Sequence, residues 1–180
     1  MVRFFLIFCL MQVSLLCAEL ASNQPASPIT ITGDEMLYNT DKNVSEVTGN
    51  ARAEKGAGPE RQILTADQFI VHFRDSNAEK SATSSGQDIE TIDAKGNVVV
   101  VKEDLVMKAD SGTYSSEMAK DPKKADQIDC KDNVSITKAG HLIQGDEGTV
   151  NLKTGIYTVK KLKRKRVKAL IQQPAKKAKA

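Results

Sequence analysis

The sequence predicts an all-β fold: a barrel, sandwich or roll built from repeats of one strand-turn unit. The first observation is a repeat, because segment 92–100 returns as segment 128–136 with matching residue types. The second is period-two alternation rich in β-branched residues, as in segment 30–32. The third is that no apolar stripe with helical spacing occurs between Ile29 and Gln173.

The repeat extends beyond its two clearest copies. In those copies a shared Asp follows the turn Asn by 13 residues, whereas Asn50 and Asp67 of a third copy lie 17 apart. The difference is an insertion of four residues, which we place at segment 56–59. A half copy opens the domain at segment 31–38. Aligned residues should share a face of the sheet. The two clearest columns are Ile31, Leu64, Met107 and Ile143, and Tyr38, Val71, Tyr114 and Val150.

Residues 1–18 are predicted to be a secretory signal that is cleaved after Ala18. Arg3 supplies the positive charge, and segment 4–16 is apolar but shorter than the roughly 20 residues of a membrane-spanning helix. Two alternatives stay open: a membrane anchor that remains attached, and lipid attachment at Cys17. Cleavage implies export to the periplasm.

The remaining chain divides into three parts. Residues 19–28 read as a linker, 29–173 as the folded domain and 174–180 as a disordered basic tail. Residues 160–180 contain 10 of the 26 Lys and Arg residues and none of the 23 Asp and Glu residues. The basic run 160–168 has three interpretations: binding of nucleic acid, contact with anionic lipid head groups, or protection of an edge strand. Export and the lack of interleaved aromatic residues argue against nucleic acid.

Turn residues predict the connections. Thr40–Asn43 and Lys153–Gly155 have the composition of hairpin turns. Asn77–Gln87 and Lys120–Lys124 read as longer loops. The last strand is expected within 160–173, with segment 167–172 as its pairing part.

No catalytic constellation is visible. His72 and His141 lack any metal-ligand spacing and are expected to be solvated or hydrogen-bonded. Cys130 would be the one cysteine left after cleavage, and its place in the repeat predicts a small buried hydrophobic residue. One Asp recurs in each unit, and we expect it to hydrogen-bond its own backbone in a turn. These four residues are Asp34, Asp67, Asp110 and Asp146. We therefore expect no enzyme activity, no metal and no cofactor.

A family resemblance rests on these motifs. The opening Ile31-Thr32-Gly33-Asp34, the repeated Gly-Asn-Val and Ala-Asp units and the terminal segment 166–171 resemble the LptA/OstA-like family of lipopolysaccharide transport. The similarity covers 29–173. It implies a twisted, jelly-roll-like roll of two facing antiparallel sheets, open at both ends, with an apolar groove for the acyl chains of lipid A. It also implies end-to-end strand pairing with further copies and with inner-membrane LptC-like and outer-membrane LptD-like components. Nucleic acid is not among the expected partners.

The resemblance and the repeat together suggest site residues. The expected groove residues are Ile31, Tyr38, Leu64, Val71, Val98, Val100, Met107, Tyr114, Val134, Ile136, Ile143 and Val150. The expected partner-strand residues are Ile29, Ile31, Val167, Ala169 and Ile171. The expected head-group contacts are Lys163, Arg164, Lys165 and Arg166. Two other functions stay open: a membrane-tethered LptC-like component, and a structural β-roll that binds polyanions through its basic tail.

Overall fold

The computed structural model describes residues 27–74, 88–117, 119–161 and 166–171. This part of the chain is built of β-strands with two short 3-10 turns and no α-helix, so no helix in it could cross a membrane. The strands are β1 (Ile29–Thr32), β2 (Glu35–Asn39), β3 (Val44–Lys55), β4 (Gln62–Phe73), β5 (Ile89–Lys102), β6 (Leu105–Ser115), β7 (Gln127–Lys138), β8 (His141–Asn151), β9 (Tyr157–Lys160) and β10 (Lys168–Leu170). The 3-10 turns are η1 (Gly58–Glu60) and η2 (Pro122–Lys124).

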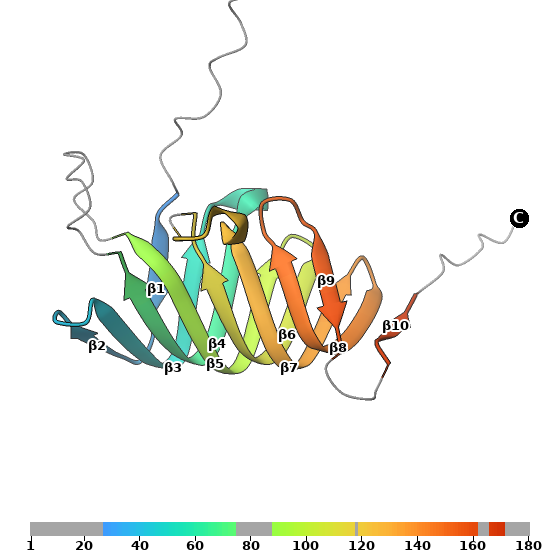
Figure 1. Cartoon of the computed structure of the whole chain (residues 1–180), viewed down its shortest axis with the longest axis horizontal. Helices are drawn as coiled ribbons and strands as arrows, with labels where there is room; N and C mark the ends of the chain where they lie inside the picture. Colours follow the sequence, from blue (N-terminus) through green and yellow to red (C-terminus); the bar gives the residue numbers. More distant parts are fainter. Residues whose placement is uncertain (1–26, 75–87, 118, 162–165, 172–180) are drawn as a thin grey trace, which may run out of the picture.

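All ten strands belong to one antiparallel sheet (Figure 1). Strands β3 to β8 follow one another in sequence order, and each is bent near its middle, so the sheet folds into two facing arms. The first arm starts with β1 and ends with β10, whereas the second starts with β2 and ends with β9. The resemblance implied two facing sheets. The structure has one sheet instead, because six long strands pass through the bend and belong to both arms.

Residues in the left-handed backbone conformation, with positive φ, form the bend. Strands β3, β5 and β7 each contain two consecutive residues with positive φ, at positions 49–50, 96–97 and 132–133. The register of every pairing among β3 to β8 shifts at this level. An extra residue in one strand of a pair is a β-bulge, which bends that strand and increases its twist. Gly and Asn are the residues that adopt this backbone conformation most readily.

The repeated Asp residues lie at the same bend, but their hydrogen bonds differ from the expectation of a local backbone contact. Each of three carboxylates accepts a hydrogen bond from the Asn side chain of a neighbouring strand. The bonds are Asn50 Nδ2 to Asp34 Oδ2 at 3.0 Å, Asn97 Nδ2 to Asp67 Oδ2 at 2.9 Å and Asn133 Nδ2 to Asp110 Oδ2 at 2.6 Å. The Asp and Asn of the repeat therefore act as a pair that ties adjacent strands together.

The predicted columns form continuous rows across the sheet. In the first arm the paired residues are Ile31, Ala53, Leu64, Val100, Met107, Ile136, Ile143 and Ala169. In the second arm they are Tyr38, Ser45, Val71, Ile92, Tyr114, Ile128, Val150 and Tyr157. The expectation that each column shares one face is confirmed, and both rows face the space between the arms.

The connections agree with the sequence at most points. Thr40–Asn43 joins β2 to β3, Lys153–Gly155 lies between β8 and β9, and Lys120–Lys124 lies in the β6–β7 connection, where it contains η2. The four-residue insertion coincides with the β3–β4 connection and η1. The predicted loop 77–87, the signal segment and the basic tail lie outside the described residues.

The end of the domain differs from the prediction of one strand within 160–173. Lys160 closes β9, and only Lys168–Leu170 pairs as β10, on the opposite arm. The predicted pairing segment 167–172 is therefore too long, since Val167 and Ile171 flank the paired residues. Of the partner-strand positions, Ile29 and Ile31 lie in β1 and Ala169 lies in β10.

Candidate functional site

The space between the arms is the candidate site. Most interior positions of the long strands carry an aliphatic, aromatic or small side chain, and the buried hydrophobic ones form one cluster that extends over β3 to β8. The largest of the fully buried side chains are Phe69, Ile92, Met107, Ile128, Ile136 and Leu152. An apolar interior of this length, with unpaired strand edges at both ends, is a geometry suited to elongated apolar ligands.

All but three of the expected groove residues are buried in this interior. Ile31 is half-buried against the cluster, Ile143 is half-buried, and Tyr38 is 40% exposed with its ring edge-on to Phe73 at 5.7 Å. These three lie toward the ends of their rows, where fewer strands cover them. The buried residues are Leu64, Val71, Val98, Val100, Met107, Tyr114, Val134, Ile136 and Val150.

The interior is largely filled by its own side chains in this structure. The apolar cavity between the arms has a volume of ≈ 30 Å³, and Leu64, Ile92, Val100 and Leu152 are among the residues that line it. Such a volume holds about one or two water molecules. An acyl chain therefore enters only if the two arms move apart.

A row rich in polar residues lies at the open edge of the first arm, which we call the mouth. Lys55, Lys102 and Lys138 each follow the Asn of their bend by five residues, so the repeat places them at equivalent positions. They are two residues beyond Ala53, Val100 and Ile136 of the apolar row, and residues two apart in a strand share a face. All three lysines therefore start from the inner face of the sheet. The full row is Ile29, Lys55, Gln62, Lys102, Leu105, Lys138 and His141.

Lys55 makes the strongest contact across the mouth. Its Nζ lies 2.7 Å from Oδ1 of Asp126 and 3.2 Å from Glu117, both in the β6–β7 connection above the second arm. The hydroxyl of Tyr114 donates a 2.8 Å hydrogen bond to the same Asp126 oxygen. Burial by itself raises the pKa of Asp126, but the hydrogen bonds from Lys55 and Tyr114 outweigh it and hold the pKa below its usual value. Asp126, 4% exposed, is thus a buried carboxylate kept charged by its partners.

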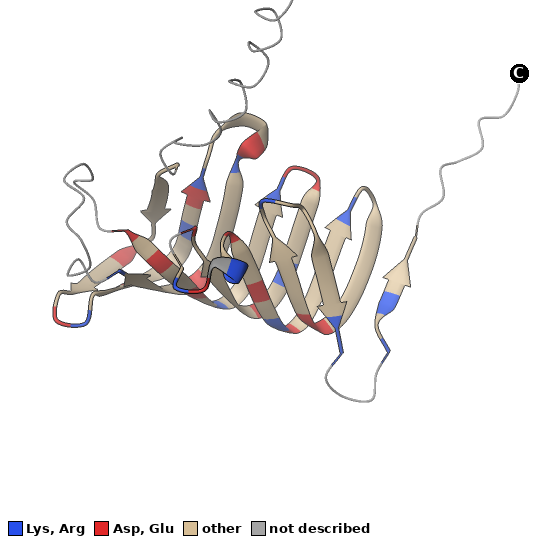
Figure 2. Cartoon of the chain, turned by 45° about the horizontal axis from the view of Figure 1, so that its top comes forward, with Lys and Arg blue, Asp and Glu red and all other residues tan. Residues whose placement is uncertain are grey.

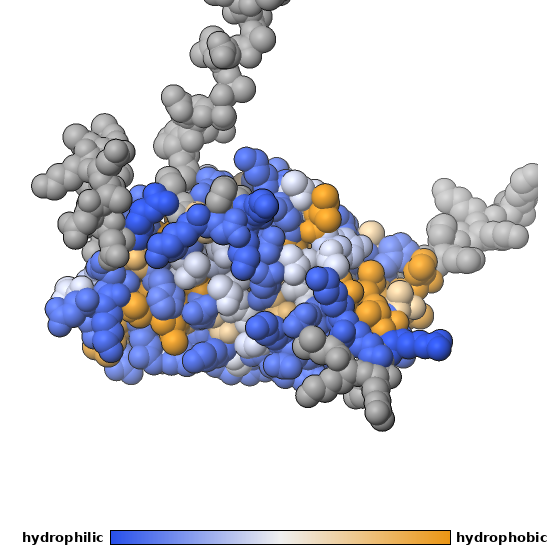
Figure 3. Space-filling model, viewed as in Figure 1, coloured by the Kyte–Doolittle hydropathy of each residue, from blue (hydrophilic) through white to orange (hydrophobic). Residues whose placement is uncertain are grey.

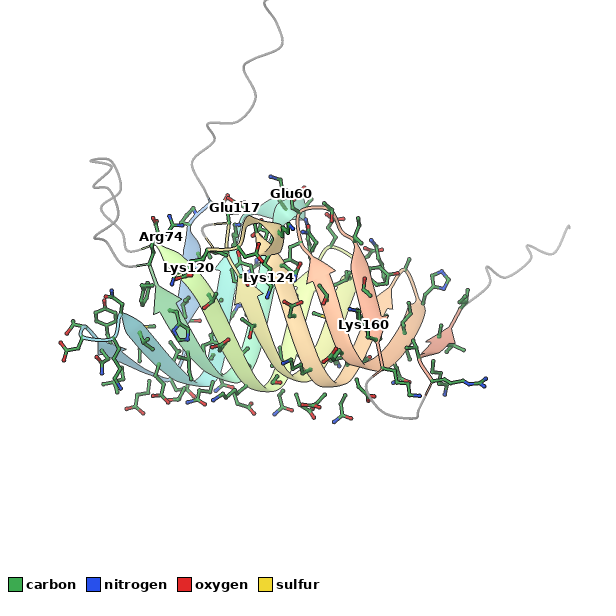
Figure 4. The ribbon with its side chains drawn as sticks, in the orientation of Figure 1. Glu60, Arg74, Glu117, Lys120, Lys124 and Lys160 are labelled. Carbon is green, nitrogen blue, oxygen red and sulfur yellow. The ribbon has the colours of Figure 1, made fainter. Side chains whose placement is uncertain are left out.

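The other two lysines make weaker contacts. Lys102 Nζ donates to the backbone oxygen of Leu152 and lies 3.5 Å from Oε2 of Glu60. Lys138 Nζ lies 5.9 Å from the ring centroid of Tyr157, a cation–π distance. Leu152 and Tyr157 belong to the second arm, so each lysine connects the two arms. Figure 4 shows Glu60 and Glu117 along the upper rim of the molecule, where these contacts lie.

A second, polar pocket opens at this rim. It has a volume of ≈ 280 Å³, and its lining includes Lys102 and Lys138 of the first arm with Lys153 of the second. Its acidic members are Glu60, Glu103 and Asp104, all exposed. Figure 2 shows charged residues of both signs along these turns. Sequence reasoning missed this site, although the lysine column was visible in the repeat alignment.

The two ends of the molecule carry its exposed apolar residues. Among the described residues, every large hydrophobic side chain that is exposed lies in or beside an end strand. They are Met36, Leu37 and Tyr38 in β2, Ile156 before β9, and Val167, Leu170 and Ile171 in or beside β10. Figure 3 shows the apolar surface at the end that bears β10. Exposed apolar residues on a strand with one unpaired edge are typical of an interaction surface.

The remaining site expectations are resolved in part. Cys130 is buried as expected, and burial raises the pKa of its thiol to about 12, which leaves it protonated. His72 lies 3.2 Å from Asp93 on the outer surface, and His141 belongs to the mouth row. Arg166 is exposed, whereas Lys163, Arg164 and Lys165 lie outside the described residues. The described residues hold no group of three His, Cys, Asp or Glu placed to bind a metal ion.

Comparison with known proteins assigns the family. Residues 30–156 match the family model described as "LptA/(LptD N-terminal domain) LPS transport protein". No curated protein matches the sequence. The fold is similar to the crystal structure of LptH from Pseudomonas aeruginosa, described as the LptA homologous periplasmic component of the lipopolysaccharide transport device. The TM-score is 0.64 at 12% identity, over 82% of this chain and 96% of that chain. The chain is therefore a member of the LptA/LptD N-terminal domain family of lipopolysaccharide transport proteins.

Proposed function

We propose that the chain is a periplasmic carrier that holds the acyl chains of lipid A between its two arms while the sugars stay outside. The observation that supports this most directly is the continuous apolar interior, which runs along both arms between end strands whose outer edges are unpaired. Burial stabilises a bound acyl chain by about 0.8 kcal/mol for each CH₂ group. No covalent step is needed, and the work of moving the lipid must come from elsewhere.

The proposal includes end-to-end assembly. The edges β1 and β2 at one end and β9 and β10 at the other present unpaired backbone groups, and exposed apolar side chains accompany them. Addition of a strand from another molecule satisfies these groups and covers this surface. A second copy of this chain, an inner-membrane LptC-like component and an outer-membrane LptD-like component are the partners that fit. Their sheets would continue the apolar interior from one molecule to the next.

A polar substitution tests the carrier role. Ile143 is half-buried near the β10 end, so Ile143→Asp should leave the fold intact while placing a carboxylate beside the acyl chains. Gln144→Asp is the matched control, since Gln144 is the exposed neighbour that faces outward. Organic extracts of the purified native proteins are compared by mass spectrometry. We expect lipid A species in the wild type and in Gln144→Asp, and their loss in Ile143→Asp. Extracts without lipid in every case would leave a structural β-roll as the better description.

A further inference from the structure

We propose that Lys102 and Lys138 hold the mouth of the interior closed, and that phosphate groups of an acylated glycolipid release them by binding in the polar pocket that they line with Lys153. This inference rests on the proposed carrier function and adds how its site opens. The ligand chemistry is a phosphate monoester attached to the molecule whose acyl chains enter between the arms.

The first support is that the interior must open. A cavity of ≈ 30 Å³ excludes an acyl chain, so a carrier of acyl chains has a second, wider state. The bend is continuous in the backbone of the six long strands, and it keeps the arms together on the opposite side. The separable contacts are therefore those at the mouth.

The second support is the difference among the three lysine contacts. Lys55 is held by a buried carboxylate, and the exposed fractions of the two side chains are 12% and 6%. Lys102 is held by a backbone oxygen and by Glu60, which is 74% exposed, and Lys138 by an aromatic ring. Charge-assisted bonds from lysine to phosphate are stronger than bonds to neutral acceptors such as a backbone oxygen or a ring. An ion pair with an exposed carboxylate such as Glu60 contributes little. A phosphate therefore competes well with the partners of Lys102 and Lys138 and poorly with Asp126.

The third support is the pocket itself. Its ≈ 280 Å³ volume lies next to the apolar interior, because Leu105, Val150 and Leu152 line it together with the lysines. Acyl chains that enter between the arms would thus leave their head group at this position.

The mouth should consequently open from the β10 end, with the Lys55–Asp126 contact staying closed. Spin labels at Ala139→Cys and Ile156→Cys report on this, because the two exposed residues lie on connections of opposite arms and neither lines the polar pocket. The full chain carries Cys9→Ser and Cys17→Ser, and the buried Cys130 thiol does not react with the label. The distance between the labels is measured by pulsed electron paramagnetic resonance.

The lipid-free protein is measured first. We expect one narrow distance in the wild type and a longer, broader distribution in the double variant Lys102→Gln, Lys138→Gln. The matched control Lys108→Gln, Lys131→Gln removes the same charge from two exposed lysines outside the mouth and should keep the narrow distance. An unchanged distance in the mouth variant would refute the closing role of the lysines. This result does not depend on lipid, so it stands even if the carrier function is wrong.

Measurements with added lipid test whether the phosphate groups open the mouth. Bisphosphorylated lipid A should lengthen the wild-type distance, whereas its dephosphorylated form should bind about tenfold more weakly, as measured by displacement of a fluorescent fatty acid. The mouth variant should lose this preference and bind both lipids alike. Opening by inorganic phosphate alone would assign the pocket to free phosphate and overturn the head-group assignment. Equal binding of both lipids by the wild type would overturn the phosphate site, and binding of neither would count against the carrier function itself.

Discussion

At the scale of single residues, the bend depends on close contacts that leave no room for a side chain. Gly96 has a φ of +74°, and a Cβ atom added there would lie 2.2 Å from Oδ2 of Asp67. Asn97 Nδ2 donates to that Asp67 oxygen at 2.9 Å and to Oδ1 of the same carboxylate at 3.2 Å. The glycine of the repeat therefore permits both the left-handed backbone and the Asp–Asn bond beside it.

We predict that Gly96→Ala destabilises the protein more than Gly58→Ala. Gly58 has a φ of +58° and an open environment, so its replacement costs only backbone strain, about 1 kcal/mol. Gly96→Ala adds the displacement of the Asp67 carboxylate, for a total of about 2–3 kcal/mol. Urea denaturation monitored by circular dichroism measures both. Equal losses would show that the carboxylate contact does not contribute.

The second prediction at this scale concerns Asp126. Replacement by Asn removes the charge that Lys55 and Tyr114 stabilise, and it should lower the free energy of unfolding at pH 7 by about 1–3 kcal/mol. The pKa of Asp126 is lowered below the ordinary value of 3.8, so its contribution is present above that pH and is lost as the pH falls through the folded-state pKa. The difference between wild type and variant should therefore shrink below about pH 4. A difference that persists in acid would show that the charge is not responsible.

At the scale of elements, the two ends differ in how their strands are used. β2 presents Met36 and Leu37 to solvent, and β10 is exposed at all three of its residues. A three-residue strand pairs weakly on its own. Its role in the proposal is to present an edge to a neighbouring molecule as well as to cover Ile143.

Removal of this strand should weaken self-association. Deletion of 167–180 takes away β10 and the apolar residues beside it, while deletion of 172–180 retains β10 and removes most of the same tail. We expect the first deletion to raise the dissociation constant of end-to-end oligomers about tenfold, equal to about 1.4 kcal/mol, and the second to leave it nearly unchanged. Light scattering over a concentration series compares them. If both deletions behave like the wild type, β10 is not part of the contact.

The elements also show what the sequence could and could not reveal. Alignment of the repeats placed Leu64 with Met107 and Val71 with Tyr114, and the structure confirms both rows, because equivalent positions in a meander fall on the same face. It could not reveal the partner of Asp67, since a repeat does not state which strand lies beside it. The length of the last strand was also overestimated from the sequence, because β10 pairs with β8 over three residues only.

At the scale of the whole molecule, the fold is one sheet that is folded over at a bend. Side chains connect its two arms at the open edge. The lysines of the mouth were overlooked for a physical reason: a charged residue at the end of a strand normally extends into solvent. Side chains alternate between the two faces of a strand, and this alternation places Lys55, Lys102 and Lys138 on the inner face, toward the other arm. Their contacts depend on the distance between arms, which pattern alone does not determine.

The central claim is that acyl chains lie between the arms, and site-specific photo-crosslinking in cells tests it most directly. The interior positions are Met107, Val134 and Ile143, and their outward-facing neighbours Lys108, Ser135 and Gln144 are the matched controls. We predict that lipopolysaccharide is captured from the interior positions and not from the neighbours. Equal capture from both sets, or capture from the outer set alone, would contradict the account.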